Sequence, residues 1–164
     1  MIRLAVIAAL VCMAQPAAAL SCLPYWVQDS WHDAVAASER YIVVAGEFAL
    51  DQPVRHRPPD VSEPNADPIT VRAQFDAQII AGGGGETRLE GTATLTFGCI
   101  AAWCAGAPDG PMLVFLREDG PGQYSSETGP CGGFIYADRP QTRAMIRACA
   151  AGGTCLSASD AMGN

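Results

Sequence analysis

Cysteine is the residue of this chain whose type and spacing most plainly could do chemistry. Six cysteines follow an N-terminal apolar run that holds a seventh, Cys12. Two pairs lie close enough in the sequence to join locally, because four residues separate one pair and five separate the other. The first residues predict export, as argued below, and an even number of cysteines in an exported chain favours disulfides. The predicted bonds are Cys99–Cys104, Cys149–Cys155 and, from the two cysteines left over, Cys22–Cys131.

Two other uses of these cysteines are weaker hypotheses. A four-thiolate zinc site has ligands about two to four residues apart at each end, and the spacing here is wider at one end. A thiol/disulfide enzyme typically carries a Cys-x-x-Cys pair, which this chain lacks. The small ring closed by Cys99 and Cys104 is the candidate for a labile bond and keeps a redox enzyme as the alternative function.

The remaining candidates for catalysis do not form a recognisable site. The two histidines, His32 and His56, fall on different segments, and His32 is flanked by Asp29 and Asp33 without the spacing of metal ligands. The run Gly82–Gly85 is not followed by the Lys-Ser/Thr of a phosphate-binding loop. We therefore predict no catalytic residue, no metal, no cofactor and no enzyme activity.

The first residues predict export. Arg3 precedes an apolar run, Leu4 to Ala14, and small residues lead to Ala19. This pattern indicates a signal peptide over residues 1–19, cut after Ala19 or after Ser21, and the run is too short to span a membrane, which needs about 20 residues. A lipoprotein box ending at Cys22 is less favoured, because Ala19 stands where leucine is usual. The expected location is periplasmic or secreted.

The charge of the chain makes some classes of binding partner a poor fit. The whole chain carries a net charge of −7, and every one of its ten basic residues is arginine. No cluster of them forms a basic patch, so nucleic acid and anionic membrane surfaces are poor partners. No second apolar stretch approaches spanning length, so stable membrane insertion is not expected.

Hydrophobic periodicity predicts the elements that would position these residues. Residues 69–79 and 89–97 alternate apolar and polar side chains around the glycine run, which indicates a long β-hairpin with one wet face. Residues 28–39 place Trp31, Ala34, Val35 and Ser38 on one face of a short helix that Asp29 or Ser30 could cap. Residues 41–48 read as a buried strand.

Later segments complete a mainly β domain. Further strands are predicted over 112–116 and 124–128, paired as a hairpin, and over 134–136. A helix begins near Asp138 and ends near Gly152-Gly153. Residues 51–68 form a proline-rich, exposed loop, and 158–164 a flexible tail. About five strands with two flanking helices predict a small, disulfide-stapled barrel.

Several short motifs resemble one family. The mature chain opens with Ser21-Cys22-Leu23-Pro24, continues to a helix and the strand Tyr41–Phe48, and later runs through Met112–Leu116 to the segment Tyr124–Gly133. This order resembles the netrin-like domain, an OB-type barrel shared with the tissue inhibitors of metalloproteinases. The resemblance implies an OB-like barrel over residues 20–157 in which Cys22 bonds to Cys131. The first cysteine of the family's Cys-x-Cys motif is absent here.

Function is predicted from this resemblance and from exposed aromatic residues. Trp103 lies within the small Cys99–Cys104 ring, where it is hard to bury, and Tyr25 and Trp26 follow the bonded Cys22. Tryptophan and tyrosine often anchor interfaces. We expect a non-catalytic domain that binds a protein partner and could act as an inhibitor. The predicted binding residues are Cys22, Leu23, Pro24, Tyr25, Trp26 and Trp103.

Overall fold

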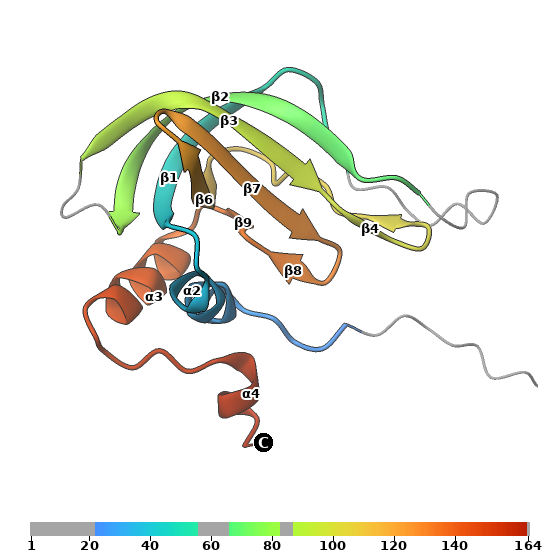
Figure 1. Cartoon of the computed structure of the whole chain (residues 1–164). Coiled ribbons are helices and arrows are strands. Elements are labelled where there is room, and N and C mark those ends of the chain that lie inside the picture. Colours follow the sequence, from blue (N-terminus) through green and yellow to red (C-terminus); the bar gives the residue numbers. More distant parts are fainter. Residues whose placement is uncertain (1–21, 56–65, 83–86, 164) are drawn as a thin grey trace, which may run out of the picture.

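The computed structural model describes residues 22–55, 66–82 and 87–163. The predicted signal peptide, His56 and most of the predicted glycine turn lie outside the described residues. Figure 1 shows a strongly curved sheet with the helices gathered on one side of it. The fold is mainly β, as predicted.

Five strands close into an OB-like barrel. They are β1 (Tyr41–Leu50), β2 (Ile69–Ala81), β3 (Arg88–Phe97), β6 (Met112–Gly120) and β7 (Gln123–Gly129). Around the barrel the order is β1-β2-β3-β7-β6, and pairing of β6 with β1 completes the circle. All neighbours are antiparallel except β3 and β7, which run parallel. This order confirms the predicted five-stranded barrel.

The predicted hairpin is present as β2 and β3. Ile69 pairs with Phe97 at one end, and the register continues without a shift to Gln78 and Arg88. Along the first part of β2 the buried side chains are Val71, Ala73, Phe75 and Ala77, with exposed polar residues between them. The alternation of apolar and polar residues therefore correctly predicted which of these side chains point into the barrel.

The strands β1 and β6 are buried on both faces because two apolar cores meet there. One core fills the barrel and includes Val44, Leu95 and Phe97. The second lies between the outside of the barrel and the helices, and it includes Val43, Phe115 and Ile146. This explains the uninterrupted apolar run at the start of β1, which an alternating strand would not have.

Two helices cover the second core, as predicted, but the first does so with a partly different face. They are α2 (Val27–Ala36) and α3 (Pro140–Ala150), which pack against each other (Figure 1). In α2 the buried residues are Val27, Ser30 and Ala34, whereas Val35 is 66% exposed. The predicted face was therefore right in part: Ala34 is buried and Trp31 packs against the second core, but Val35 is exposed. Ser30, which was predicted as a possible cap, is buried because the helix begins earlier, at Val27.

The predicted hairpin of β6 and β7 is present, but the two strands pair only near their turn, from Arg117 onward and not over residues 112–116. Along its other edge β7 runs parallel to β3. The two strands separate because Phe134 lies between them. Its carbonyl oxygen accepts from the N–H of Phe115, and its own N–H donates to the carbonyl of Glu127, both at 2.9 Å.

The remaining strands are short. They are β4 (Cys99–Ile100) paired with β5 (Trp103–Cys104), β8 (Gly132–Gly133) paired with β7, and β9 (Ile135–Ala137) paired with β6. The strand β9 confirms the segment predicted near residues 134–136. The described ends of the 51–68 loop carry no strand before Ile69, but Val54 is buried in the barrel core, so that part is not simply an exposed loop.

The C-terminal segment was predicted to be a flexible tail, whereas the structure shows a short helix, α4 (Ala158–Ala161). Ser157 caps it by accepting from the N–H of Asp160 at 3.1 Å, and Ala158 is only 1% exposed. The burial of Ala158 against the rest of the fold explains the difference. Among the described residues, no helix is long and apolar enough to cross a membrane.

Candidate binding surface

All three predicted disulfides have the geometry of bonded pairs. The Cα atoms lie 5.2 Å apart in Cys22–Cys131, 4.0 Å in Cys99–Cys104 and 4.8 Å in Cys149–Cys155. The first bond joins the start of the described chain to the turn between β7 and β8. It thereby fixes the segment Cys22–Trp26, which has no regular secondary structure, against the barrel. We call these five residues the stapled segment.

Tyr25 holds the middle of the stapled segment in place. Its ring lies so close to Gly132 that a Cβ atom there would come within 2.5 Å of the ring carbon Cδ1. Gly132 also has a φ of +120°, which only glycine adopts readily. The Tyr25 hydroxyl donates to the Oδ2 atom of Asp33 at 2.6 Å. Burial, reinforced by this carboxylate, raises the pKa of Tyr25 well above its ordinary value.

A buried polar cluster fixes the last residue of the segment. Ser30 is fully buried, and its hydroxyl donates to the carbonyl oxygen of Gly133 at 2.6 Å. The same hydroxyl lies 2.5 Å from the Tyr136 hydroxyl, which is 3.3 Å from the carbonyl oxygen of Trp26. Burial raises the pKa of Tyr136 to about 12. The cluster therefore ties α2, β8 and β9 together beneath Trp26.

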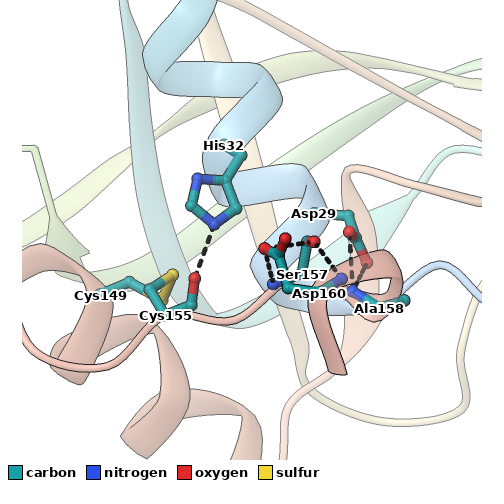
Figure 2. The surroundings of a disulfide bond; sticks show 7 residues. All are labelled: Asp29, His32, Cys149, Cys155, Ser157, Ala158 and Asp160. Carbon is teal, nitrogen blue, oxygen red and sulfur yellow. Dashed lines mark hydrogen bonds between the residues drawn. A yellow bond between two sulfur atoms is a disulfide. The ribbon is translucent and has the colours of Figure 1, made fainter. Parts of the chain in front are cut away.

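The C-terminal segment supports the start of α2 from the other side. Figure 2 shows Asp29 beside the backbone of Ala158 and His32 beside the carbonyl of Cys155. Asp29 also accepts from the N–H of Trp26 at 2.6 Å, so it caps α2 from the third helical position. His32 Nε2 lies 2.7 Å from the Cys155 oxygen, so its contact is structural.

The stapled segment combines a fixed backbone with exposed apolar side chains. Leu23 is 83% exposed and Trp26 is 41% exposed. Cys22 and Pro24 are also exposed, whereas Tyr25 is half-buried. The structure therefore brings five of the six predicted binding residues into one continuous surface.

Trp103 is exposed, as predicted, but on a separate element. It is 40% exposed on the β4–β5 hairpin, opposite Ile100, which is 39% exposed. Its hairpin neighbour Cys104 is buried. Trp103 and Ile100 therefore form a second, small apolar surface.

A groove of about 540 Å³ adjoins the stapled segment, and the sequence did not indicate it. Tyr25 and Cys131 line it, and Pro68 and Phe134 contribute further apolar lining. Much of its surface is backbone, contributed by Gly98, Gly129, Gly132 and Gly133. We call it the glycine groove. The only signal for it in the sequence is the run Gly129-Pro130-Cys131-Gly132-Gly133 around the bonded cysteine.

The described residues offer little that could act on a substrate. No three of their His, Cys, Asp and Glu side chains are grouped so as to hold a metal ion. Ser126 is buried and its hydroxyl has no hydrogen-bond partner in the described structure, but it lies on a barrel strand, whereas the described histidine, His32, contacts the C-terminal segment. The features that this surface does offer are exposed apolar side chains, hydrogen-bonding groups and carboxylates.

Comparison with known proteins gives no relative from which to transfer a function. No protein family, no curated protein and no solved structure matches the chain. The function must therefore be inferred from the geometry of the molecule itself.

Proposed function

We propose that the protein is an exported, non-catalytic domain that binds another protein through its stapled segment. The observation that carries this proposal is the position of Leu23, 83% exposed next to a cysteine that is bonded to the barrel. If Leu23 lay on a flexible terminus, ordering that terminus on binding would cost conformational entropy. Here the disulfide already orders the backbone in the folded protein, so binding costs less entropy.

The neighbours of Leu23 fit the same role. Tryptophan is among the residue types that most often carry binding energy at interfaces. The main chain of Trp26 is held by two hydrogen bonds, from its N–H to Asp29 and from the Tyr136 hydroxyl to its carbonyl oxygen. Export is supported by three disulfides, which persist in oxidising compartments, and by the signal-like first residues. The strand order and the N-terminal staple also support the proposal of a netrin-like domain.

Site-specific photo-crosslinking in the cells that make the protein tests this proposal. Leu23 or Trp26 is replaced by p-benzoylphenylalanine, and the matched control carries it at Val35, which is also exposed but lies on α2, nine positions after the stapled segment ends. We expect a discrete protein adduct from positions 23 and 26 and none from position 35. No discrete adduct at 23 or 26, or the same adducts from all three positions, contradicts the proposal.

A further inference from the structure

One of the glycines that line the glycine groove occupies a position where a side chain would fit. Gly129 lies at the end of β7 with no positive φ, so its backbone does not require glycine. A Cβ atom at this position would meet only the carbonyl oxygen of Gly132, at an ordinary 3.6 Å. The fold could therefore accommodate a larger residue at Gly129, and because Gly129 lines the groove we expect that side chain to occupy part of it.

Two carboxylates line the groove, and no basic side chain does. They are Asp33, from α2, and Glu127, from β7, and both residues are exposed. No ion pair joins either of them to another described residue. Arg117 lines a neighbouring pocket together with Glu127, but its Nε atom binds Asp119 at 2.6 Å. The groove is therefore negative, within a chain of net charge −7.

Apolar and backbone surfaces make up the rest of the groove. The Tyr25 ring, Pro68 and Phe134 offer apolar contact. The glycines let another main chain approach closely, because no side chains hold it away. An extended peptide suits such a site better than a helix, since an extended chain presents backbone groups and alternating side chains to a narrow groove.

We propose that the glycine groove binds an extended segment of the partner protein that carries an arginine or lysine between apolar residues. The basic side chain lies between Asp33 and Glu127, and its apolar neighbours contact Tyr25 and Phe134. This inference rests on the proposed function, and it adds the chemical class of the partner segment. The groove continues from the stapled segment through Tyr25, so both surfaces can contact one partner.

Titration of the oxidised, ¹⁵N-labelled protein with short blocked peptides tests the inference. The probes are acetyl-Val-Val-Arg-Val-Ala-amide and the same peptide with glutamate in place of arginine. We expect the arginine peptide to shift the amide signals of Gly98, Gly129 and Gly132, and the glutamate peptide to leave them unchanged. Equal shifts with both peptides, or no shift at these glycines, would overturn the inference.

Three variants locate the binding. Gly129→Val fills the groove and should abolish the shifts, whereas Glu127→Gln should weaken binding about two- to fivefold, the size expected of one exposed ion pair. Asp109→Asn is the matched control, because it removes one exposed carboxylate that does not line the groove. Binding that survives Gly129→Val, or that Asp109→Asn weakens as much as Glu127→Gln does, contradicts the inference.

The two proposals fail in different ways. Adducts at Leu23 without any binding of the arginine peptide would reject the groove and leave the stapled segment as the contact surface. Binding of the peptide without any adduct at Leu23 or Trp26 would reject the stapled segment as that surface.

Discussion

The carboxylate of Asp29, in the first turn of α2, accepts a hydrogen bond from the backbone N–H of Ala158, the first residue of α4, at 3.0 Å. The same carboxylate accepts from the N–H of Trp26. One side chain therefore joins the end of the stapled segment to a helix 129 residues away in the chain. The two ends of the folded domain support each other at this point.

Replacing Asp29 by alanine should release α4. The change removes the acceptor of Ala158 and the N-terminal cap of α2, and loss of such a cap costs about 1 kcal/mol. We expect the backbone amides of Ala158 to Ala161 to exchange with deuterium much faster than in the wild type. Asp109→Ala, which removes an exposed carboxylate far from α2 in the sequence, serves as the control and should leave exchange unchanged. Unaltered protection in Asp29→Ala would show that α4 is held by other contacts.

The stability of the domain should fall at alkaline pH. The folded state raises the pKa of Tyr136 from 10.0 to about 12, chiefly through burial, so the neutral phenol is the form that the fold favours. The contribution of Tyr136 is complete below pH 10 and is lost as the pH rises toward 12. Over this window the contribution of Tyr136 to the free energy of unfolding should drop by about 2 to 3 kcal/mol, and Tyr25, whose pKa is also raised by burial, adds to the loss. Denaturant unfolding measured at several pH values checks this.

Tyr136→Phe is the matched control for that pH dependence. It should lower stability at neutral pH, because the hydrogen bond between Ser30 and Tyr136 is lost, while Ser30 still donates to Gly133. Across the same alkaline window its stability should fall less steeply than that of the wild type. A slope equal to that of the wild type would mean that other groups cause the alkaline loss.

The Cys22–Cys131 bond should stabilise the fold more than the Cys149–Cys155 bond. The two bonds span 109 and 6 positions of the chain. In the chain-entropy model, loops of these lengths correspond to about 5 and about 2 kcal/mol. Thermal and denaturant unfolding of the two double cysteine-to-serine variants measures the difference. A larger loss from the shorter loop would show that native packing around Cys149 outweighs loop entropy.

Gly132→Ala should displace Tyr25. The added methyl group would clash with the ring, and the φ of +120° disfavours any side chain, so a loss of about 1 to 3 kcal/mol is expected. Gly129→Ala, three residues earlier, meets neither obstacle and should cost little. Comparison of the two unfolding free energies, with the ring signals of Tyr25 as a local probe, checks the effect. Equal stability of both variants would contradict the close packing of Tyr25 on Gly132.

Local patterns predicted much of this fold. Alternation of polar and apolar residues was sufficient for β2 and β3, because one face of each is buried and the other is wet. Spacing was sufficient for the two local disulfides, and the third followed once those pairs were assigned. The stapled segment could be predicted because it directly follows Cys22.

Features that depend on distant residues could not be predicted in this way. Ser30 was predicted only as a possible helix cap, whereas it is fully buried and its acceptor, Gly133, lies 103 positions away. The parallel pairing of β3 with β7 carries no local signal, since each strand reads the same whichever neighbour it has. The glycine groove is formed where four separate glycines meet, and a single glycine in a sequence more often indicates a turn.

The most direct test of the central claim is to measure, in the same variants, partner capture and thermal stability. Trp26→Ala and Trp103→Ala are introduced into the protein that carries the crosslinker at position 23. We predict that Trp26→Ala reduces the yield of the position-23 adduct about tenfold, as the loss of an interface anchor does, and keeps the wild-type melting temperature. Trp103→Ala, on a separate hairpin, should reduce the yield less. Unchanged adduct yield in Trp26→Ala, or unfolding of that variant, would contradict the claim that the stapled segment is a contact surface.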